Sequence, residues 1–158
     1  MSVKVTEQVE VLEVTREIEI AATIDIVWET VLENMGPLNE SPDKQLHQLV
    51  LEPRPGGRWY RDFGNDTGYW WGSVQSIKPP ELLELHGPMF MSAPAVNHVI
   101  FRLKEENGST FITFSHRAMG LIPHHLMDGV DVNRGWDNFF VNVRDGVGER
   151  LKATKETS

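Results

Sequence analysis

The 158-residue chain contains no cysteine. Disulfide bonds, thiolate nucleophiles and thiolate zinc sites are therefore excluded, and nothing calls for an oxidising compartment. No window approaches the ~18 apolar residues that a membrane-spanning helix needs. Residues 1–14 also lack the basic start and continuous apolar run of a signal peptide. We therefore expect a cytoplasmic protein without a membrane span.

Positive charge is scarce, with 15 Lys and Arg against 23 Asp and Glu and a net charge of −8. A nucleic-acid backbone or an anionic membrane favours a basic face, so neither is expected as a partner. A hydrophobic content of 40% and a charged content of 24% are typical of an ordinary globular protein. One domain over residues 1–158, with an ordered core at about residues 9–152, is the expected organisation.

Motifs of the large enzyme classes are also missing. The sequence has no nucleophile elbow, phosphate-binding loop, dinucleotide fingerprint or paired-carboxylate spacing. His124 and Asp128 have the four-residue spacing of two metal ligands, but no third ligand is evident and a solvated helix start is the favoured interpretation. We predict no metal and no cofactor, and we favour a protein without catalysis while leaving an enzyme open.

The feature that organises the chain is an apolar stripe near its C-terminus. Five residues recur there at steps of four, three, four and four, namely Trp136, Phe140, Val143, Val147 and Leu151. This spacing predicts a long helix from Pro123 to about Lys152. Burying the five side chains contributes roughly 1.5–3 kcal/mol each, which outweighs about 1 kcal/mol for each interior glycine. The helix therefore needs a surface to lie on.

The preceding residues predict a strand, a helix and then a run of shorter strands. The first strand is expected over residues 9–20, with an irregularity near Leu12–Glu13, and the helix is expected from Ile24 to Met35 with Thr23 as its N-cap. Further strands are expected over residues 47–52, 58–63, 69–77, 82–86, 96–103 and 110–117.

This order of elements predicts an α+β fold, in which a curved antiparallel sheet of six to seven strands wraps around the long C-terminal helix. One or two short helices follow the first strand. A sheet of this shape leaves a hollow at one end of the helix, and we place it beside Gly135 and Trp136.

Alternation along the strands assigns side chains to the inner face of the sheet. Trp59 and Phe63 share a face with Arg61, and of the neighbours Trp70 and Trp71 we favour Trp71 as the inner one. The interpretation as plain core competes with that of a cavity wall. The candidate ligand-binding residues are Trp59, Arg61, Phe63, Trp71, His86, Met89, Met91, His98, Phe101, Phe114, His116, Trp136 and Phe140.

Four of these candidates are polar. An unpaired Arg61 on the inner face would cost several kcal/mol, so it pairs with an acidic residue such as Glu84, reaches to the rim, or binds a ligand carboxylate. A buried histidine at 86, 98 or 116 is most often hydrogen-bonded core; otherwise it orients a polar ligand group or acts as a general acid or base. The loop with Met89 and Met91 is expected either to fill the end of the cavity as a hydrophobic plug or to form an apolar rim that adapts to varied ligands.

A series of short motifs resembles the START-like (SRPBCC) superfamily. The motifs occur in the expected order as Thr15–Ile20 with Ala21-Ala22, Val27-Trp28, Pro55-Gly56-Gly57-Arg58-Trp59, Gly72-Ser73-Val74, Ile77–Leu83 and Gly135-Trp136. They are most similar to the group of proteins that resemble the C-terminal domain of the activator of the ninety-kilodalton heat-shock chaperone's ATPase. The resemblance covers about residues 14–152 and implies a helix-grip fold with a hydrophobic pocket between the sheet and the C-terminal helix.

The same resemblance implies little about activity, because relatives include lipid carriers, hormone receptors and polyketide aromatases and cyclases. We expect the chain to bind a small hydrophobic or amphipathic molecule without catalysis. The alternatives are a polyketide aromatase/cyclase-like enzyme that uses a pocket histidine, and a chaperone-modulating or other protein-interaction module. The eukaryotic activator carries a further N-terminal domain for which this chain has no room, which makes a chaperone partner doubtful. A homodimer is left open.

Overall fold

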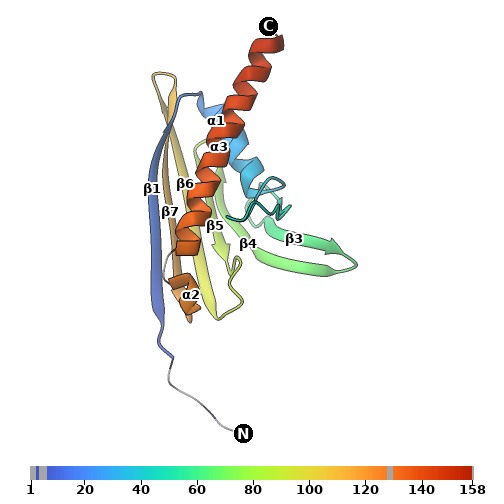
Figure 1. Cartoon of the computed structure of the whole chain (residues 1–158), viewed down its shortest axis with the longest axis vertical. Helices are drawn as coiled ribbons and strands as arrows, with labels where there is room; N and C mark the ends of the chain where they lie inside the picture. Colours follow the sequence, from blue (N-terminus) through green and yellow to red (C-terminus); the bar gives the residue numbers. More distant parts are fainter. Residues whose placement is uncertain (1–2, 4–6, 128–129, 158) are drawn as a thin grey trace.

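The computed structural model describes residue 3 and residues 7–127 and 130–157. Its elements are β1 (Glu10–Ile20), α1 (Ile24–Met35), β2 (Val50–Leu51), β3 (Arg58–Gly64), β4 (Thr67–Lys78), β5 (Leu82–Gly87), β6 (Ala95–Glu106), β7 (Ser109–Gly120), α2 (His124–Met127) and α3 (Val130–Thr157). The strands form one antiparallel sheet in the order β1-β7-β6-β5-β4-β3-β2. Figure 1 shows α3 lying across one face of this curved sheet, which confirms the predicted α+β helix-grip fold.

The apolar stripe of α3 is buried as its spacing predicts. Four of its five residues are buried, and Leu151 is partly buried against the same core. The predicted single helix from Pro123 is divided into α2 and α3, and Asp128 and Gly129 lie outside the described residues. The last turns of α3 extend beyond the edge of the sheet (Figure 1), past the predicted end at Lys152.

Helix α1 packs against α3 and against strands β6 and β7 of the sheet. It begins after Thr23 as predicted, but the Thr23 side chain makes no capping hydrogen bond. The carboxylate of Glu105 accepts instead from the backbone N–H of Ile24 at 2.6 Å. Where α1 meets α3, a Cβ on Gly146 would lie 2.8 Å from Cγ2 of the buried Thr30. The two helices can approach this closely because residue 146 has no side chain.

Strand β1 forms an unbroken ladder with β7 from Glu10 to Ile20. The predicted irregularity near Leu12–Glu13 is therefore wrong. Leu12 and Val14 face the core, and Val11 is an apolar residue exposed on the outer face of the sheet. Because Val11 is apolar but exposed, it interrupts the alternation of apolar and polar residues, and this interruption suggested an irregularity that the regular pairing with β7 does not have.

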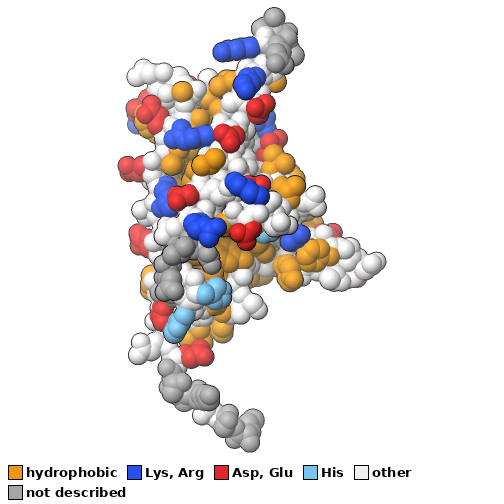
Figure 2. Space-filling model, viewed as in Figure 1, with side chains coloured by type: hydrophobic (Ala, Val, Ile, Leu, Met, Phe, Trp, Pro, Cys, Tyr) orange, Lys and Arg blue, Asp and Glu red, His pale blue; other side chains and the backbone are white. Residues whose placement is uncertain are grey.

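The β3–β4 hairpin projects from the rest of the sheet (Figure 1). The register of the two strands shifts between Trp59 and Tyr60 and again between Asp62 and Gly64. None of the helices in the described residues covers the tip, and Phe63 is 49% exposed. Figure 2 shows hydrophobic side chains on the surface of this hairpin. Phe63 does not line the cavity, and its predicted place there is wrong. Alternation itself holds, since Phe63 still shares a face with Arg61, but this face is uncovered at the tip of the hairpin.

None of the helices in the described part of the chain is long and apolar enough to cross a membrane.

Candidate functional site

A cavity of about 340 Å³ lies beside Gly135 and Trp136, at the N-terminal half of α3. This volume falls within the range of roughly 300–1,000 Å³ that is typical of small-molecule sites. Residues 39–43 and His47 form one wall, and the sheet and the loop after β5 contribute the other. The aromatic residues of the lining are Trp59, Trp71, Phe90, Trp136 and Phe139.

Two tryptophans on neighbouring strands form the floor of the cavity. The rings of Trp59 and Trp71 meet edge to face, with centroids 5.2 Å apart and planes at 82°. The indole N–H of Trp59 donates to the carbonyl oxygen of Met35 at 2.7 Å, which fixes the ring against the end of α1. Trp71 is 8% exposed and Trp70 is 51% exposed. The preference for Trp71 as the inner residue is therefore confirmed.

The loop after β5 folds back over Trp71 because two glycines allow β4 and β5 to come very close. A Cβ on Gly87, whose φ is +153°, would lie 2.4 Å from the Cα of Gly72. Beyond this contact, the backbone N–H of Met89 donates to the carbonyl oxygen of Trp71 at 2.8 Å. Met89 thus becomes part of the cavity lining, whereas Met91 is buried outside it.

Three of the predicted aromatic residues fill the space next to the cavity. Phe101, Phe114 and Phe140 are almost completely buried, and the ring centroid of Phe114 lies 5.0 Å from that of Phe101 and 5.3 Å from that of Phe140. Trp136 contacts Phe114 at 4.4 Å and also lines the cavity. The predicted aromatic set therefore divides into a packed cluster and a cavity wall, and Trp136 belongs to both.

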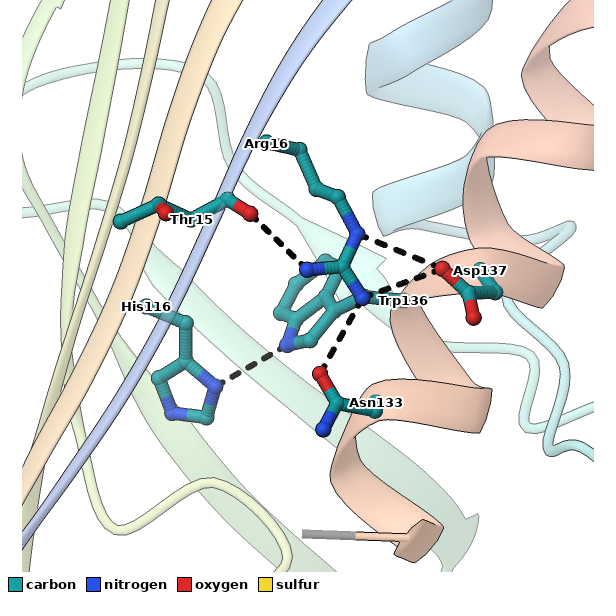
Figure 3. Close-up of polar contacts among 6 residues, drawn as sticks. All are labelled: Thr15, Arg16, His116, Asn133, Trp136 and Asp137. Carbon is teal, nitrogen blue, oxygen red and sulfur yellow. Dashed lines mark hydrogen bonds and ion pairs between the residues drawn. The ribbon is translucent and has the colours of Figure 1, made fainter.

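His116 faces inward as predicted, but protein groups occupy both of its ring nitrogens. The indole N–H of Trp136 donates to Nδ1 at 3.0 Å (Figure 3), and Nε2 lies 2.7 Å from Oδ1 of Asn97. The amide nitrogen of Asn97 donates to the carbonyl of Pro88 at 3.1 Å, so its oxygen faces the imidazole and Nε2 carries the proton. Burial, assisted by the nearby His98, lowers the pKa of His116 to about 4. His116 is a neutral structural link between α3, β7 and β6.

The other two predicted histidines lie on the outer face of the sheet, and their expected place at the cavity is wrong. His86 is exposed, and Nε2 of His98 lies 2.6 Å from the carboxylate of Glu84. The inner positions of these strands belong to apolar residues such as Leu85 and Val99, which leaves the histidines on the opposite side. Within residues 7–127 and 130–157, no three His, Asp or Glu side chains are grouped to hold a metal ion.

Arg61 lies on the projecting hairpin and does not line the cavity. Its guanidinium lies 4.7 Å from the ring centroid of Phe63, and the side chain is partly exposed. The suggested partner Glu84 is bonded to His98 instead. Binding of a ligand carboxylate by Arg61 stays a prediction.

The polar wall formed by residues 39–43 and His47 was not predicted from the sequence. Glu40 and Leu46 form a β-bridge, so this segment folds back on itself beside α3. The Glu40 carboxylate accepts from the side-chain amides of Asn138 at 3.2 Å and Asn142 at 2.9 Å. The paired asparagines, four residues apart beside the apolar stripe of α3, were the available signal that a polar segment docks there.

Arg16 joins the edge strand β1 to the same part of α3. Its guanidinium donates to Asp137 at 3.0 Å, to Asn133 at 3.1 Å and to the carbonyl of Thr15 at 2.8 Å (Figure 3). Trp136 lies between this exposed cluster and His116. The N-terminal half of α3 is therefore held from two sides, while its third side faces the cavity.

Comparison with solved structures shows the same fold in several bacterial proteins. An uncharacterized protein from Rhizobium leguminosarum aligns with a TM-score of 0.66 at 14% identity, over 92% of this chain and 99% of its own. A protein of unknown function from Staphylococcus aureus gives the same TM-score and identity, over 92% and 98%. The Zhui aromatase/cyclase from a Streptomyces species aligns with a TM-score of 0.64 at 16% identity, over 92% and 98%. At these identities the likeness concerns the fold alone.

The sequence matches no curated protein. The profile of the family described as activator of Hsp90 ATPase homolog 1-like protein matches residues 41–152, which is more than half of the chain. The matched range begins in the polar wall of the cavity and ends near the C-terminus of α3. This match shows that the chain belongs to the activator of Hsp90 ATPase homolog 1-like family.

Proposed function

We propose that this protein binds a small apolar or amphipathic molecule in the cavity beside Gly135. The observation that carries the proposal is a hollow of about 340 Å³ whose lining is mostly apolar and includes three tryptophans and two phenylalanines. Protein interiors are otherwise packed to the density of organic crystals. An unfilled space lined by Trp59, Trp71 and Trp136 therefore supports a binding role.

Among the predicted ligand-binding residues, Trp59, Trp71, Met89 and Trp136 line the cavity and would contact the ligand directly. Phe101, Phe114 and Phe140 would act behind them by holding Trp136 in place. Catalysis is not part of the proposal. The aromatase/cyclase alternative relied on His86, His98 or His116, and these three residues lie outside the cavity lining. A cytoplasmic location also belongs to the proposal, whereas a homodimer and a protein partner stay untested.

The proposal is tested by filling the cavity from α3. A Cβ on Gly135 would lie 3.9 Å from its nearest neighbour, the Pro42 side chain, so Gly135→Leu introduces bulk into the cavity without a clash at the backbone. Gly148 lies on the same helix with no atom within 4 Å of such a Cβ. Gly148→Leu is therefore a matched control, since both changes raise helix propensity equally.

Isothermal titration calorimetry with 2-methoxynaphthalene as probe measures binding to each variant. We expect the wild type and Gly148→Leu to bind alike, and Gly135→Leu to lose at least tenfold in affinity. Equal binding by all three would place the probe elsewhere, and the absence of binding to the wild type would contradict the proposed function. Native mass spectrometry of freshly purified protein adds the mass of any retained ligand.

A further inference from the structure

The polar wall of the cavity contains a hydrogen-bond acceptor in a fixed orientation. Nδ1 of His47 lies 2.7 Å from Oδ1 of Asn39. The amide nitrogen of Asn39 donates to the carbonyl of Asn34 at 3.0 Å, so its oxygen must face the imidazole. A carbonyl oxygen accepts only, and Nδ1 of His47 therefore carries a proton. In the neutral ring, Nε2 is left with its lone pair exposed.

The neutral form of His47 is the favoured one. The side chain is half-buried, and its burial together with the nearby positive charge of Arg61 lowers the pKa of His47 below its ordinary value. Nε2 has no hydrogen-bond partner among residues 7–127 and 130–157, although the ring lines the cavity. The ring also packs against Trp71, with centroids 5.4 Å apart. The acceptor thus adjoins the aromatic floor of the cavity.

The charged groups at the cavity are already paired with one another. The amine of Lys44 lies 3.4 Å from the carboxylate of Glu40, and the guanidinium of Arg134 lies 3.9 Å from that of Asp43. Hydrogen bonds from Asn142 and Asn138 lower the pKa of Glu40, so this lining carboxylate is ionised at neutral pH. Because each carboxylate is matched by a cation, a charged ligand would find no unpaired counter-charge here and would lose its hydration in a largely apolar space.

We propose that the ligand is a neutral, flat aromatic molecule bearing a hydroxyl group that donates a hydrogen bond to Nε2 of His47. The inference rests on the proposed function, since it names the chemical class that the same cavity selects. Flat rings suit a lining in which Trp71 already makes edge contacts with Trp59 and with Phe90. The hydroxyl supplies the donor that Nε2 of His47 lacks among the described residues.

The test compares three probes on one skeleton by isothermal titration calorimetry near neutral pH: 2-naphthol, 2-methoxynaphthalene and 2-naphthoate. His47→Phe keeps a ring at this position but removes the acceptor. We expect the ratio of the naphthol to the methoxynaphthalene association constant to fall by about fivefold in His47→Phe, which is the usual effect of one neutral hydrogen bond. His86→Phe, on the outer face of the sheet, is the matched control and should keep the wild-type ratio.

A second measurement needs no variant. Nitrogen-15 NMR of histidine-labelled wild-type protein distinguishes the two neutral tautomers of His47, and we expect the form protonated at Nδ1. Addition of 2-naphthol should shift the Nε2 resonance, whereas 2-methoxynaphthalene should shift it much less. A dominant Nε2-protonated tautomer would overturn the inference whether or not the variants fold.

The outcomes separate this inference from the proposed function. Binding of both neutral probes with a ratio unaffected by His47→Phe would refute the hydroxyl assignment and leave the cavity as the binding site. Preference for 2-naphthoate, lost in an Arg61→Gln variant, would refute it in favour of a carboxylate ligand. Failure of the wild type to bind any of the three probes would contradict both proposals.

Discussion

The link between His116 and Trp136 makes a quantitative prediction about acid stability. His116 is completely buried, and its two nitrogens are bonded to Trp136 and Asn97. Protonation of Nδ1 would remove the acceptor of the Trp136 indole and place a charge in the core. The folded protein therefore resists protonation of His116, whereas the unfolded chain takes up this proton with the pKa of about 6.5 of an ordinary histidine.

The size of the effect follows from the lowered pKa of His116, which is about 4 in the folded protein. Above pH 6.5 both states are neutral at this residue, so the fold keeps its full stability. As the pH falls from 6.5 to 4, only the unfolded chain is protonated, and the free energy of unfolding decreases. Each pKa unit is worth about 1.4 kcal/mol, so the total loss is about 3 kcal/mol.

The perturbation is His116→Gln. A glutamine amide can accept from the indole of Trp136 and donate to Asn97, but it does not titrate in this range. Urea unfolding followed by circular dichroism, at several pH values between 7.5 and 4.5, measures the free energy of unfolding of each protein. Relative to the wild type, the variant should gain stability steadily as the pH falls. His125→Gln, in the exposed turn of α2, is the control and should follow the wild type.

Comparison of variants is necessary because other groups also respond to acid. The pKa values of Glu40, Glu52 and Glu84 are lowered by hydrogen bonds, chiefly from Asn142, Arg58 and His98 respectively. Their protonation destabilises the wild type and the variant equally at low pH. A constant difference between wild type and His116→Gln over the whole range would refute the claim that the fold keeps His116 neutral.

Three further predictions concern the packing of α3 and α1. Gly146→Ala should destabilise the fold by about 1–3 kcal/mol because its Cβ meets Thr30, whereas Gly148→Ala should stabilise it by up to about 1 kcal/mol. Thermal unfolding of the two variants measures both effects, and equal effects would contradict the close contact between α1 and α3. Trp59→Phe should cost about 2 kcal/mol in urea unfolding because the buried carbonyl of Met35 loses its donor, and a neutral result would contradict this account. Arg16→Met should lower the free energy of unfolding by less than about 1 kcal/mol, and this loss should shrink as salt is added because salt screens the ion pair with Asp137. A loss that does not depend on salt would contradict the ion-pair explanation and indicate lost packing.

Much of the fold follows from periodicity in the sequence. The stripe from Trp136 to Leu151 identifies α3 because one helix face needs apolar residues at steps of three and four. Strand β7 is likewise evident, since Phe114 lies between Thr113 and Ser115, and Phe114 pairs directly with Phe101 of β6 in the sheet. These signals are local, and burial on one face is sufficient to produce them.

The candidate site was less predictable because it depends on contacts between distant segments. Phe63 was misplaced because the tip of the β3–β4 hairpin projects beyond the described helices, so its ring is exposed although it shares a face with Arg61. His86 and His98 were misplaced because the alternation that puts Leu85, Val99 and Phe101 on the inner face was not applied to the histidines beside them. His47 was overlooked because its role depends on Asn39 and on the return of residues 39–47 to α3, which is tertiary structure. Local patterns predict the layers of the fold but not the lining of the space between them.

The central claim is that the hollow at one end of α3 receives an apolar molecule. A crystal structure of the protein with 2-methoxynaphthalene tests it most directly. The account predicts density for the probe between Trp59, Trp71 and Trp136, with Gly135 at its edge. Density for the probe only at another surface, with this cavity closed by its own side chains, would contradict the claim.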